Sequence, residues 1–351
     1  MEKVQLLKGN EALAEAAVRA GCRYYFGYPI TPQNEIPAYM SKRLPEVGGV
    51  FIQAESETAS INMVYGACSC GARAMTSSSS PGISLMQEGL SYLAGADLPA
   101  VVINVMRGGP GLGNISPSQA DYLQSVKGGG HGDYNLIVLA PYSVQEIVDL
   151  TIKCFDLAFK YRNPVMLIAD GMLGQMSEPV VLPKMIDVKD DLDWVVGNGN
   201  HAIIHSLYLN PEDMLEIHNA KLQKKYEAIK NECIEFEKYL CDDATSIFVS
   251  YGTPARVCKA AIDELREKGI KVGLFRPISL WPFPEKELNE LASQVANHSG
   301  KVIVVEMAKN QLEQDVKLAV NGKCEIVALN KLGGAIFNET EIIDFVLKDR
   351  K

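Results

Sequence analysis

Three apolar segments in the first half of the chain constrain its fold more than any other feature. They cover residues 100–105 (AVVINV), 136–139 (LIVL) and 165–169 (VMLIA), and none alternates regularly between apolar and polar residues. This pattern is typical of strands whose sheet is covered on both faces, as parallel sheets usually are. Helical segments such as residues 144–160 separate them, as the crossover connections of a parallel sheet require. The sequence therefore predicts an α/β domain with helices on both faces of a parallel sheet.

The last hundred residues repeat this alternation and predict a second α/β domain. The expected strands cover residues 246–250, 271–275, 301–306 and 325–329. A chain of 351 residues is too long for one ordinary core, whereas about a hundred residues suffice for an independent domain. We predict a first domain at residues 1–185, a linker with a long helix at 186–243, and a second parallel-sheet domain at 244–351.

The linker carries an apolar seam on an otherwise charged helix. Asn210 and Pro211 predict the start of this helix, because Asn caps helices and Pro favours the first helical position. The seam consists of Leu215, Leu222, Tyr226, Ile229, Cys233, Phe236 and Leu240. Such a seam fits either a coiled-coil dimer or a connector helix that packs on a neighbouring domain. We favour the connector helix, which is the more common arrangement.

Charge and cysteine pattern exclude several classes of protein. The formal net charge is −9, whereas proteins that bind nucleic acids need a basic surface. The N-terminal segment lacks the basic and apolar regions of a secretory signal, and no apolar run is long enough for a transmembrane helix. The eight cysteines form no C-x-x-C motif, so we expect reduced thiols and no iron–sulfur cluster in this chain. We predict a cytoplasmic protein with neither a nucleic-acid nor a membrane partner.

Glu57 is the first candidate for a catalytic group. It follows the apolar run at residues 50–52 and begins a helix of small residues that extends to Gly71. Ligands of α/β sheets bind at the carboxyl ends of the strands, and a helix N-terminus favours an ionised carboxylate. Glu55 lies two residues earlier, and a first-turn helix acid without a catalytic role has the same sequence pattern. Residue type alone decides neither which of the two carboxylates is the candidate nor whether it has a catalytic role.

Two further segments place polar groups where strands end. Residues 28–32 (YPITP) follow the first strand, and the two prolines hold the backbone around Thr31 extended. Arg107 follows the strand at residues 100–105 and precedes a glycine-rich loop at 108–113. An arginine can hold a carboxylate through two parallel hydrogen bonds, and the glycines let the backbone approach a ligand. The plainer interpretations are a turn threonine and a surface arginine.

Two other loops carry weaker signals. Ser80 and Pro81 predict a helix start, with Ser80 as the N-cap. The serines at 77–80 also fit an anion site made of hydroxyls and free N–H groups. His131 lies in the glycine-rich loop at 128–132, where it is either a general acid or base or an exposed turn residue.

Together these segments resemble the pyrimidine-binding, alpha-type subunit of 2-oxoacid:ferredoxin oxidoreductases. The motifs that carry the resemblance are YPITP at 28–32, AESETA at 54–59 and RGGPGLG at 107–113, and the match covers most of the chain in order and type. FRPI at 275–278 and WPFP at 281–284 are similar to the transketolase C-terminal domain. The glycine-rich loops look closest to the members that act on a branched-chain 2-oxoacid, 2-oxoisovalerate.

The resemblance implies roles for the candidate residues. It aligns Glu57, rather than Glu55, with the glutamate that activates the aminopyrimidine ring of thiamine diphosphate. Thr31 and Arg107 would bind the 2-oxoacid. Contacts to the cofactor would come from Tyr28, Pro29, Ile30 and Glu57.

The resemblance also implies partner subunits. Thiamine enzymes hold Mg²⁺ and the diphosphate with a motif that starts Gly-Asp-Gly. Residues 132–134 (GDY) match only the first two positions of this start. A beta-type subunit would supply that site, a gamma-type subunit and a ferredoxin-like delta subunit would complete the assembly, and the partners would hold the iron–sulfur clusters. The complex would decarboxylate 2-oxoisovalerate oxidatively to CO₂ and an acyl group on coenzyme A, and it would reduce ferredoxin.

Other functions remain open from the sequence. The same type of enzyme acting on 2-oxoglutarate or pyruvate is the nearest. A pyrimidine-binding half of a non-redox thiamine-dependent decarboxylase is more distant, because such halves generally lack a second α/β domain like the one expected at residues 246–330. A non-enzymatic scaffold is the third.

Overall fold

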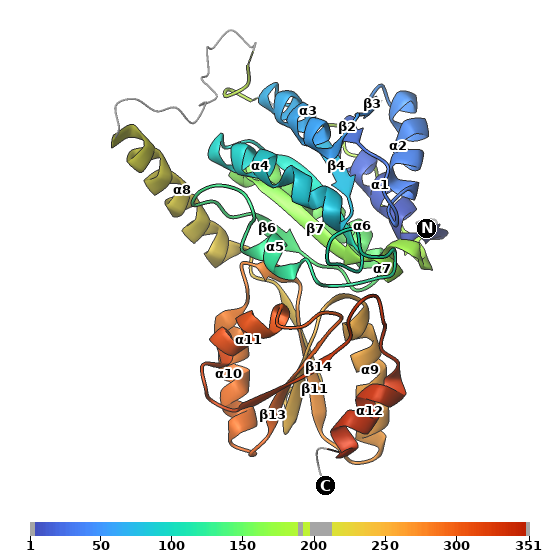
Figure 1. Ribbon diagram of the computed structural model, residues 1–351, viewed down its shortest axis with the longest axis vertical. Coiled ribbons are helices and arrows are strands. Elements are labelled where there is room, and N and C mark those ends of the chain that lie inside the picture. The colour runs from blue at the N-terminus through green and yellow to red at the C-terminus, as the bar shows by residue number, and fades with distance from the viewer. Residues whose placement is uncertain (1–3, 189–191, 197–212, 349–351) are drawn as a thin grey trace.

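The computed structural model describes residues 4–188, 192–196 and 213–348, which form two α/β domains, one above the other in Figure 1. The first domain contains a seven-stranded sheet in the order β12-β6-β7-β5-β4-β2-β3. Its strands are β2 (Tyr24–Gly27), β3 (Val50–Gln53), β4 (Ala74–Ser78), β5 (Ala100–Met106), β6 (Ile137–Leu139), β7 (Pro164–Asp170) and β12 (Ser279–Trp281). The strands β2 to β7 pair in parallel, and β12 pairs antiparallel with β6. The predicted parallel sheet is confirmed.

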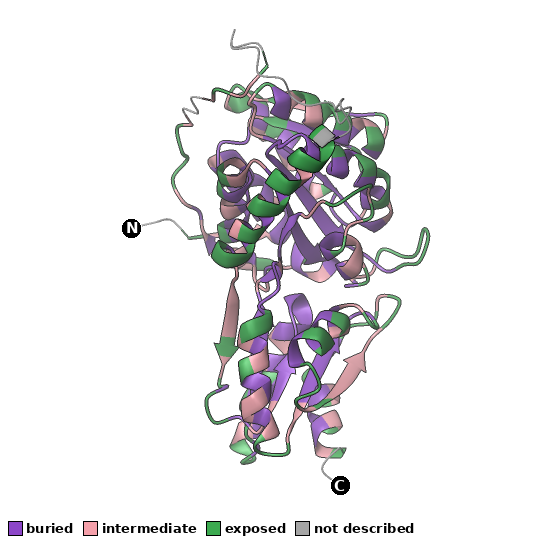
Figure 2. Cartoon of the chain, turned by 90° about the vertical axis from the view of Figure 1, so that its left-hand side faces the viewer, coloured by how far each residue is buried: buried purple, intermediate pink, exposed green. Residues whose placement is uncertain are grey.

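Helices cover both faces of this sheet. They are α1 (Gly9–Arg19), α2 (Glu35–Glu46), α3 (Glu57–Ser69), α4 (Ser80–Gly95), α5 (Tyr122–Val126), α6 (Val144–Tyr161) and α7 (Gly171–Gln175). All residues of β5 and β7 are buried, and successive residues of β5 point to opposite faces. Val102 packs in a cluster with residues of α3 and α4, whereas Val101 and Ile103 pack with residues of α1, α2 and α6. Figure 2 shows the strands buried between helices with exposed outer surfaces.

The second domain contains a five-stranded sheet in the order β14-β13-β10-β11-β9. Its elements are β9 (Phe236–Tyr239), β10 (Ser246–Val249), α9 (Gly252–Glu267), β11 (Val272–Pro277), α10 (Glu285–Ala296), β13 (Lys301–Glu306), α11 (Leu312–Val320), β14 (Glu325–Asn330) and α12 (Glu339–Lys348). The strands β10, β11, β13 and β14 pair in parallel, as predicted. Helices α9 and α12 lie on one side of the sheet, and α10 and α11 lie on the other (Figure 1).

The linker helix α8 (Asp213–Glu232) packs on the first domain. Its Lys225 Nζ lies 2.6 Å from Asp97 Oδ1, and Tyr226 is fully buried in the core of that domain. This contact supports the connector interpretation. The continuation of the seam through Phe236 and Leu240 is wrong, because the helix ends at Glu232 and Phe236 starts β9, which pairs antiparallel with β11. The predicted helix start at residues 210–211 lies outside the described residues.

Two further short antiparallel pairings, besides that of β9 with β11, were not predicted from the sequence. Strands β1 (Val4–Lys8) and β8 (Ser177–Val181) form a separate two-stranded sheet. β12 comes directly after β11 of the second domain in the chain, but it pairs with β6 and so extends the sheet of the first domain. Among the described residues, no helix is both long and apolar enough to cross a membrane.

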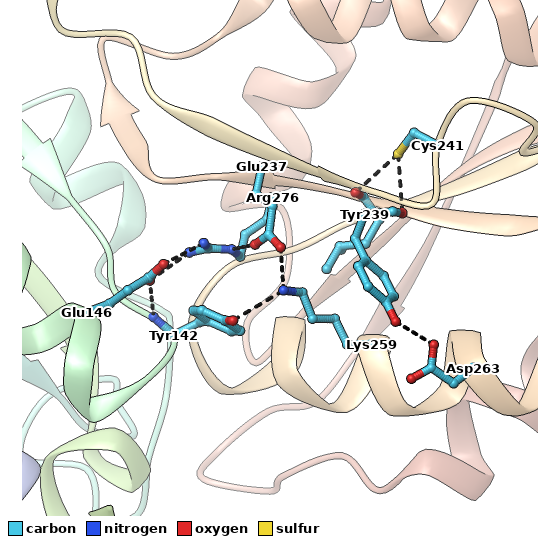
Figure 3. Close-up of polar contacts among 9 residues, drawn as sticks. Tyr142, Glu146, Glu237, Tyr239, Cys241, Lys259, Asp263 and Arg276 are labelled. Carbon is cyan, nitrogen blue, oxygen red and sulfur yellow. Dashed lines mark hydrogen bonds and ion pairs between the residues drawn. The ribbon is translucent and has the colours of Figure 1, made fainter. Parts of the chain in front are cut away.

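A buried ionic network joins the two domains (Figure 3). Arg276 of β11 is 2% exposed, and its Nη1 and Nη2 donate to the two carboxylate oxygens of Glu146 in α6 at 2.9 and 2.7 Å. Its Nε donates to Glu237 of β9 at 2.7 Å, and Lys259 of α9 donates to the same carboxylate. Burial opposes ionisation of Glu237, but the hydrogen bonds from Lys259 and Arg276 outweigh it and lower its pKa.

We expect the variant Arg276→Met to lower the free energy of unfolding by about 3 kcal/mol, because it leaves the partly buried Glu146 carboxylate without its cationic partner and Glu237 with Lys259 alone. Thermal unfolding followed by circular dichroism measures this effect. The control is Lys268→Met, which removes an exposed helical ion pair with Glu264 that is worth at most about 0.5 kcal/mol. Equal melting temperatures for the two variants would contradict the importance of the network.

Candidate active site

The predicted site residues follow four strands that are neighbours in the first sheet. In the order β5-β4-β2-β3, these strands are followed by Arg107, by the serines at 79–80, by residues 28–32 and by Glu57, respectively. All four strands are parallel, so their carboxyl ends lie at one edge of the sheet. This edge is where α/β sheets bind their ligands.

Glu57 is the first residue of α3, and its carboxylate is buried. The preceding Ser56 caps the helix, since its Oγ accepts a hydrogen bond from Ala59 N at 3.1 Å. Glu57 is 6% exposed, whereas Glu55 is exposed. Burial therefore separates two carboxylates that residue type alone left ambiguous.

Glycine at position 82 makes room for the Glu57 side chain. A Cβ on Gly82, in the first turn of α4, would lie 2.5 Å from Glu57 Oε1 and 2.0 Å from Ser78 Oγ. Ser78 and Ser79 are fully buried, and among the described residues neither hydroxyl has a hydrogen-bond partner. Buried polar atoms without partners are rare in folded proteins, so the Ser78 hydroxyl beside Glu57 is an unsatisfied polar group.

The loop after β2 is fastened by its backbone and leaves side chains accessible. The carbonyl of Pro32 accepts hydrogen bonds from Asn10 Nδ2 and Gln175 Nε2, both at 2.8 Å. Tyr28 is 37% exposed, Pro29 is exposed, and Ile30 and Thr31 are partly exposed. The loop thus has a fixed backbone and a surface that a ligand or a partner chain can contact.

Arg107 and the loop after β2 are in direct contact. Arg107 is 7% exposed, and its Nη1 donates to Thr31 O at 2.9 Å and its Nη2 to Leu112 O at 3.0 Å. Its Nε is buried and has no partner among the described residues. The guanidinium group is thus held by two backbone carbonyls and keeps a free donor.

Ser80 does not cap α4, contrary to the prediction. Ser79 is the N-cap residue, and its side chain makes no cap hydrogen bond. The Ser80 hydroxyl instead takes part in a separate hydrogen-bond network. Ser80 Oγ donates to Asp121 Oδ2 at 2.5 Å and accepts from Arg107 N at 3.0 Å. Asn104 Nδ2 donates to the same Asp121 oxygen at 3.0 Å. Burial raises the pKa of Asp121, partly offset by these hydrogen bonds and by Arg107.

Asn104 and Asp121 were not predicted from the sequence. Asn104 interrupts the apolar run of β5, and a polar residue in a buried strand is the signal that was available. Asp121 lies in a loop with no local pattern. His131, in contrast, is exposed, on a loop whose Gly129 N donates to Gln87 Oε1 of α4 at 2.9 Å.

A cleft of about 570 Å³ lies between the two domains beside this network. Ser80, Asp121 and residues 109–111 line it from the first domain, and residues 307–309 and 332–333 line it from the second. Among the described residues, no group of three or more His, Cys, Asp or Glu side chains is placed to bind a metal ion.

Known protein families match both domains. A family model described as the thiamine diphosphate-binding domain of pyruvate flavodoxin/ferredoxin oxidoreductase matches residues 15–239. A second, described as pyruvate:ferredoxin oxidoreductase core domain II, matches residues 244–342.

Relatives and solved structures agree with these matches. The chain is 49% identical to the ketoisovalerate oxidoreductase subunit VorB of Methanothermobacter marburgensis, over 99% of this chain and 97% of that protein. It is 38% identical to the 2-oxoglutarate synthase subunit KorA of Methanocaldococcus jannaschii, over 98% of this chain and 100% of that protein.

A solved 2-oxoglutarate:ferredoxin oxidoreductase from Magnetococcus marinus, with 2-oxoglutarate, coenzyme A and succinyl-CoA bound, superposes with a TM-score of 0.87 at 26% identity, over all of this chain and 66% of that chain. A split-gene transketolase shares the fold, with a TM-score of 0.60 at 13% identity over 97% of each chain. The chain therefore belongs to the 2-oxoacid:ferredoxin oxidoreductase family, in agreement with its sequence motifs.

Proposed function

We propose that this chain is the pyrimidine-binding subunit of a thiamine diphosphate-dependent oxidoreductase that acts on ketoisovalerate (2-oxoisovalerate). The observation that carries the proposal is the buried Glu57 carboxylate at the N-terminus of α3, within the segment that matches a thiamine diphosphate-binding domain. The 49% identity to a ketoisovalerate oxidoreductase subunit supports the substrate. The reaction is an oxidative decarboxylation that yields CO₂, an acyl-CoA and reduced ferredoxin.

The residues present fit the pyrimidine end of the cofactor. An aminopyrimidine offers ring nitrogens and an amino group, and the site offers the Glu57 carboxylate together with the Ser78 and Ser79 hydroxyls, which have no partner among the described residues. Tyr28, Pro29 and Ile30 present accessible surface at the same edge of the sheet. When bound, thiamine diphosphate supplies a nucleophilic thiazolium carbon and an electron sink for the decarboxylation.

Glu57 would hold a proton on the ring nitrogen that it contacts. Because Glu57 is 6% exposed, little water would compete for the contact, which would strengthen the hydrogen bond. Glu57 would thereby hold the aminopyrimidine ring in place, and the amino group of the bound cofactor would supply a base.

Arg107 and Thr31 orient the 2-oxoacid. The buried Arg107 Nε is a donor without a partner among the described residues, and together with one Nη it can hold a carboxylate side-on. The Thr31 hydroxyl, which accepts a hydrogen bond from Asn34 Nδ2 at 3.2 Å, still has its own proton to donate. The two groups would fix the carboxylate and leave the 2-oxo carbon facing the cofactor.

Partner subunits complete the enzyme in this proposal. A beta-type subunit supplies Mg²⁺ and the diphosphate site, gamma-type and ferredoxin-like delta subunits complete the assembly, and the iron–sulfur clusters lie in the partners. The relatives are named as subunits, and the solved relative has coenzyme A bound, which supports coenzyme A as the acyl acceptor. Ferredoxin is the electron acceptor.

A second candidate substrate is 2-oxoglutarate, because a relative named 2-oxoglutarate synthase subunit KorA is 38% identical to this chain. Measuring kcat/KM of the purified complex with 2-oxoisovalerate, 2-oxoglutarate and pyruvate tests the proposal. We expect the highest value for 2-oxoisovalerate. A higher value for either other acid would reassign the substrate, and a complex without thiamine diphosphate would refute the enzyme assignment.

We expect Glu57→Gln to lower kcat of the complex by about a hundredfold or more, because a neutral amide cannot support the proton transfer. Glu55→Gln is the matched control, since Glu55 is an exposed carboxylate two residues away. It should keep kcat within about twofold, and both variants should retain thiamine diphosphate and partner subunits. Full turnover by Glu57→Gln would exclude this role.

Gly82→Ala should displace the Glu57 carboxylate, because the added methyl group would overlap Glu57 Oε1 and Ser78 Oγ. Since small misplacements of catalytic groups are costly, we expect kcat to fall by about tenfold or more. The control is Gly66→Ala in α3, where a Cβ would have no neighbour within 4 Å and where alanine favours the helix. If both variants have wild-type kcat, Gly82 is not needed to seat Glu57.

For Arg107→Ala we expect kcat/KM for the 2-oxoacid to fall by about thirtyfold or more, because the variant removes one side of a charge-assisted hydrogen bond. The KM for coenzyme A should not change. Steady-state kinetics with each substrate varied in turn measures both values. An unchanged kcat/KM for the 2-oxoacid would remove Arg107 from the substrate site.

A further inference from the structure

The loop after Arg107 is closed on itself by hydrogen bonds at its neck. Gly108 N donates to Ser116 O at 2.9 Å, and Asn114 N donates to Gly108 O at 2.9 Å. Asn114 Oδ1 accepts from Ser116 N at 3.0 Å. Asn114 thus uses its backbone and its side chain to close the segment 108–116, which we call the arginine loop.

The tip of the arginine loop contacts Arg107 through the backbone alone. Leu112 O accepts the hydrogen bond from Arg107 Nη2 at 3.0 Å, while the Leu112 side chain is 81% exposed. The other contact of the guanidinium, at Thr31 O, belongs to a loop that Asn10 and Gln175 fasten. The guanidinium orientation therefore depends on how firmly the arginine loop is held.

The second domain holds this loop. Asn114 Nδ2 donates to Gly333 O at 2.7 Å. A Cβ on Gly108 would lie 3.3 Å from the carbonyl carbon of Gly333, and one on Gly334 would lie 2.3 Å from Ser116 Cβ. Gly333 and Gly334 have φ of +63° and +95°, so the turn needs glycine both for its conformation and for the close approach.

We propose that Asn114 and the turn at Gly333–Gly334 are positioning elements, through which the second domain fixes the arginine loop and so orients Arg107 toward the carboxylate of the 2-oxoacid. The inference rests on the proposed role of Arg107 in substrate binding. It assigns the second domain a part in substrate affinity, although none of the predicted site residues lies in that domain.

If Asn114 had a purely structural role, its variants would change the stability of the chain rather than the KM for the 2-oxoacid. The two domains have independent links elsewhere, since Arg276 binds Glu146 and Thr253 Oγ1 donates to the buried Asp170 at 2.6 Å. A variant at Asn114 leaves these links in place. The fold should therefore survive, and a change in the KM for the 2-oxoacid can be separated from a change in stability.

The test uses the assembled complex with 2-oxoisovalerate as the varied substrate. Asn114→Asp keeps the acceptor for Ser116 N and loses the donor to Gly333, and Asn114→Ala loses both. We expect the KM for 2-oxoisovalerate to rise about fivefold in both variants, as the loss of one hydrogen bond implies. We expect kcat and the KM for coenzyme A to stay within about twofold of wild type, because neither depends on this contact.

Two matched controls separate positioning from stability. Asn338→Ala removes an equally exposed asparagine of the second domain, which caps α12 by accepting from Glu341 N at 3.0 Å, and should leave the KM for 2-oxoisovalerate unchanged. Gly334→Ala should raise that KM because of the overlap with Ser116. Gly322→Ala should not, since Gly322 also has a positive φ, of +74°, but no atom within 4 Å of its Cβ.

Hydrogen–deuterium exchange of the complex gives a readout independent of turnover. Amides 111–116 should exchange about fivefold faster in Asn114→Asp than in wild type. Unchanged KM for 2-oxoisovalerate in both Asn114 variants, or an unchanged exchange rate, overturns the proposal. Arg107→Ala measured in parallel separates the causes: if it raises the KM and the Asn114 variants do not, only the positioning role fails, and if it does not, the proposed role of Arg107 fails as well.

Discussion

The register of the β4–β5 ladder is the constraint on which the site depends. Ser78 pairs with Asn104 in this ladder, which sets the ends of the two strands side by side. Asn104 shares a face of the sheet with Val102 and Met106, and from there its amide reaches Ser80 N and Asp121. A shift of one residue would turn every side chain of β5 to the opposite face. The apolar residues that bury both faces of β5 therefore also aim its one polar side chain.

Arg107 is a buried cation without an ion-pair partner among the described residues, and this points to a binding site for an anion. Burying a cation is costly unless it is paired. Among the described residues no carboxylate lies within ion-pair distance of Arg107, which donates to two neutral carbonyls instead. The nearby Asp121 is bonded to Ser80 and Asn104. The positive charge of Arg107 therefore has no anionic partner among the described residues. A carboxylate substrate would supply that partner without reorganisation of the protein.

The sequence predicted the parts of the fold that depend on long apolar runs and failed where tertiary contacts decide. β5 and β7 are buried on both faces, so their sequences are distinctive without knowledge of their neighbours. β9 and β12 have four and three residues, and they are strands because β11 and β6 offer edges to pair with. The spacing of Phe236 in the seam predicted a helix. In the structure Phe236 lies in a strand instead, because β9 pairs with β11 and the Phe236 ring stacks on Phe275.

The same division applies to the site. Glu57 and Arg107 were candidates because they follow strands, and the family resemblance assigned their roles. The burial that separates Glu57 from the exposed Glu55 needed the structure. Asp121 was missed because its partners, Ser80 and Asn104, lie 41 and 17 residues away in sequence. A loop carboxylate has no periodic pattern, so only the folded chain identifies it.

The docking of the domains explains how a distant turn can affect the site. One apolar cluster contains buried residues of both domains, including Val102 and Met166 of the first and Phe275 and Leu288 of the second. A shared core resists the relative motion that is expected of domains joined by a small polar interface. The turn at residues 333–334 is therefore a fixed support for the arginine loop. Since catalytic and binding groups need supports that do not move, a domain can matter to a site without contributing a side chain to it.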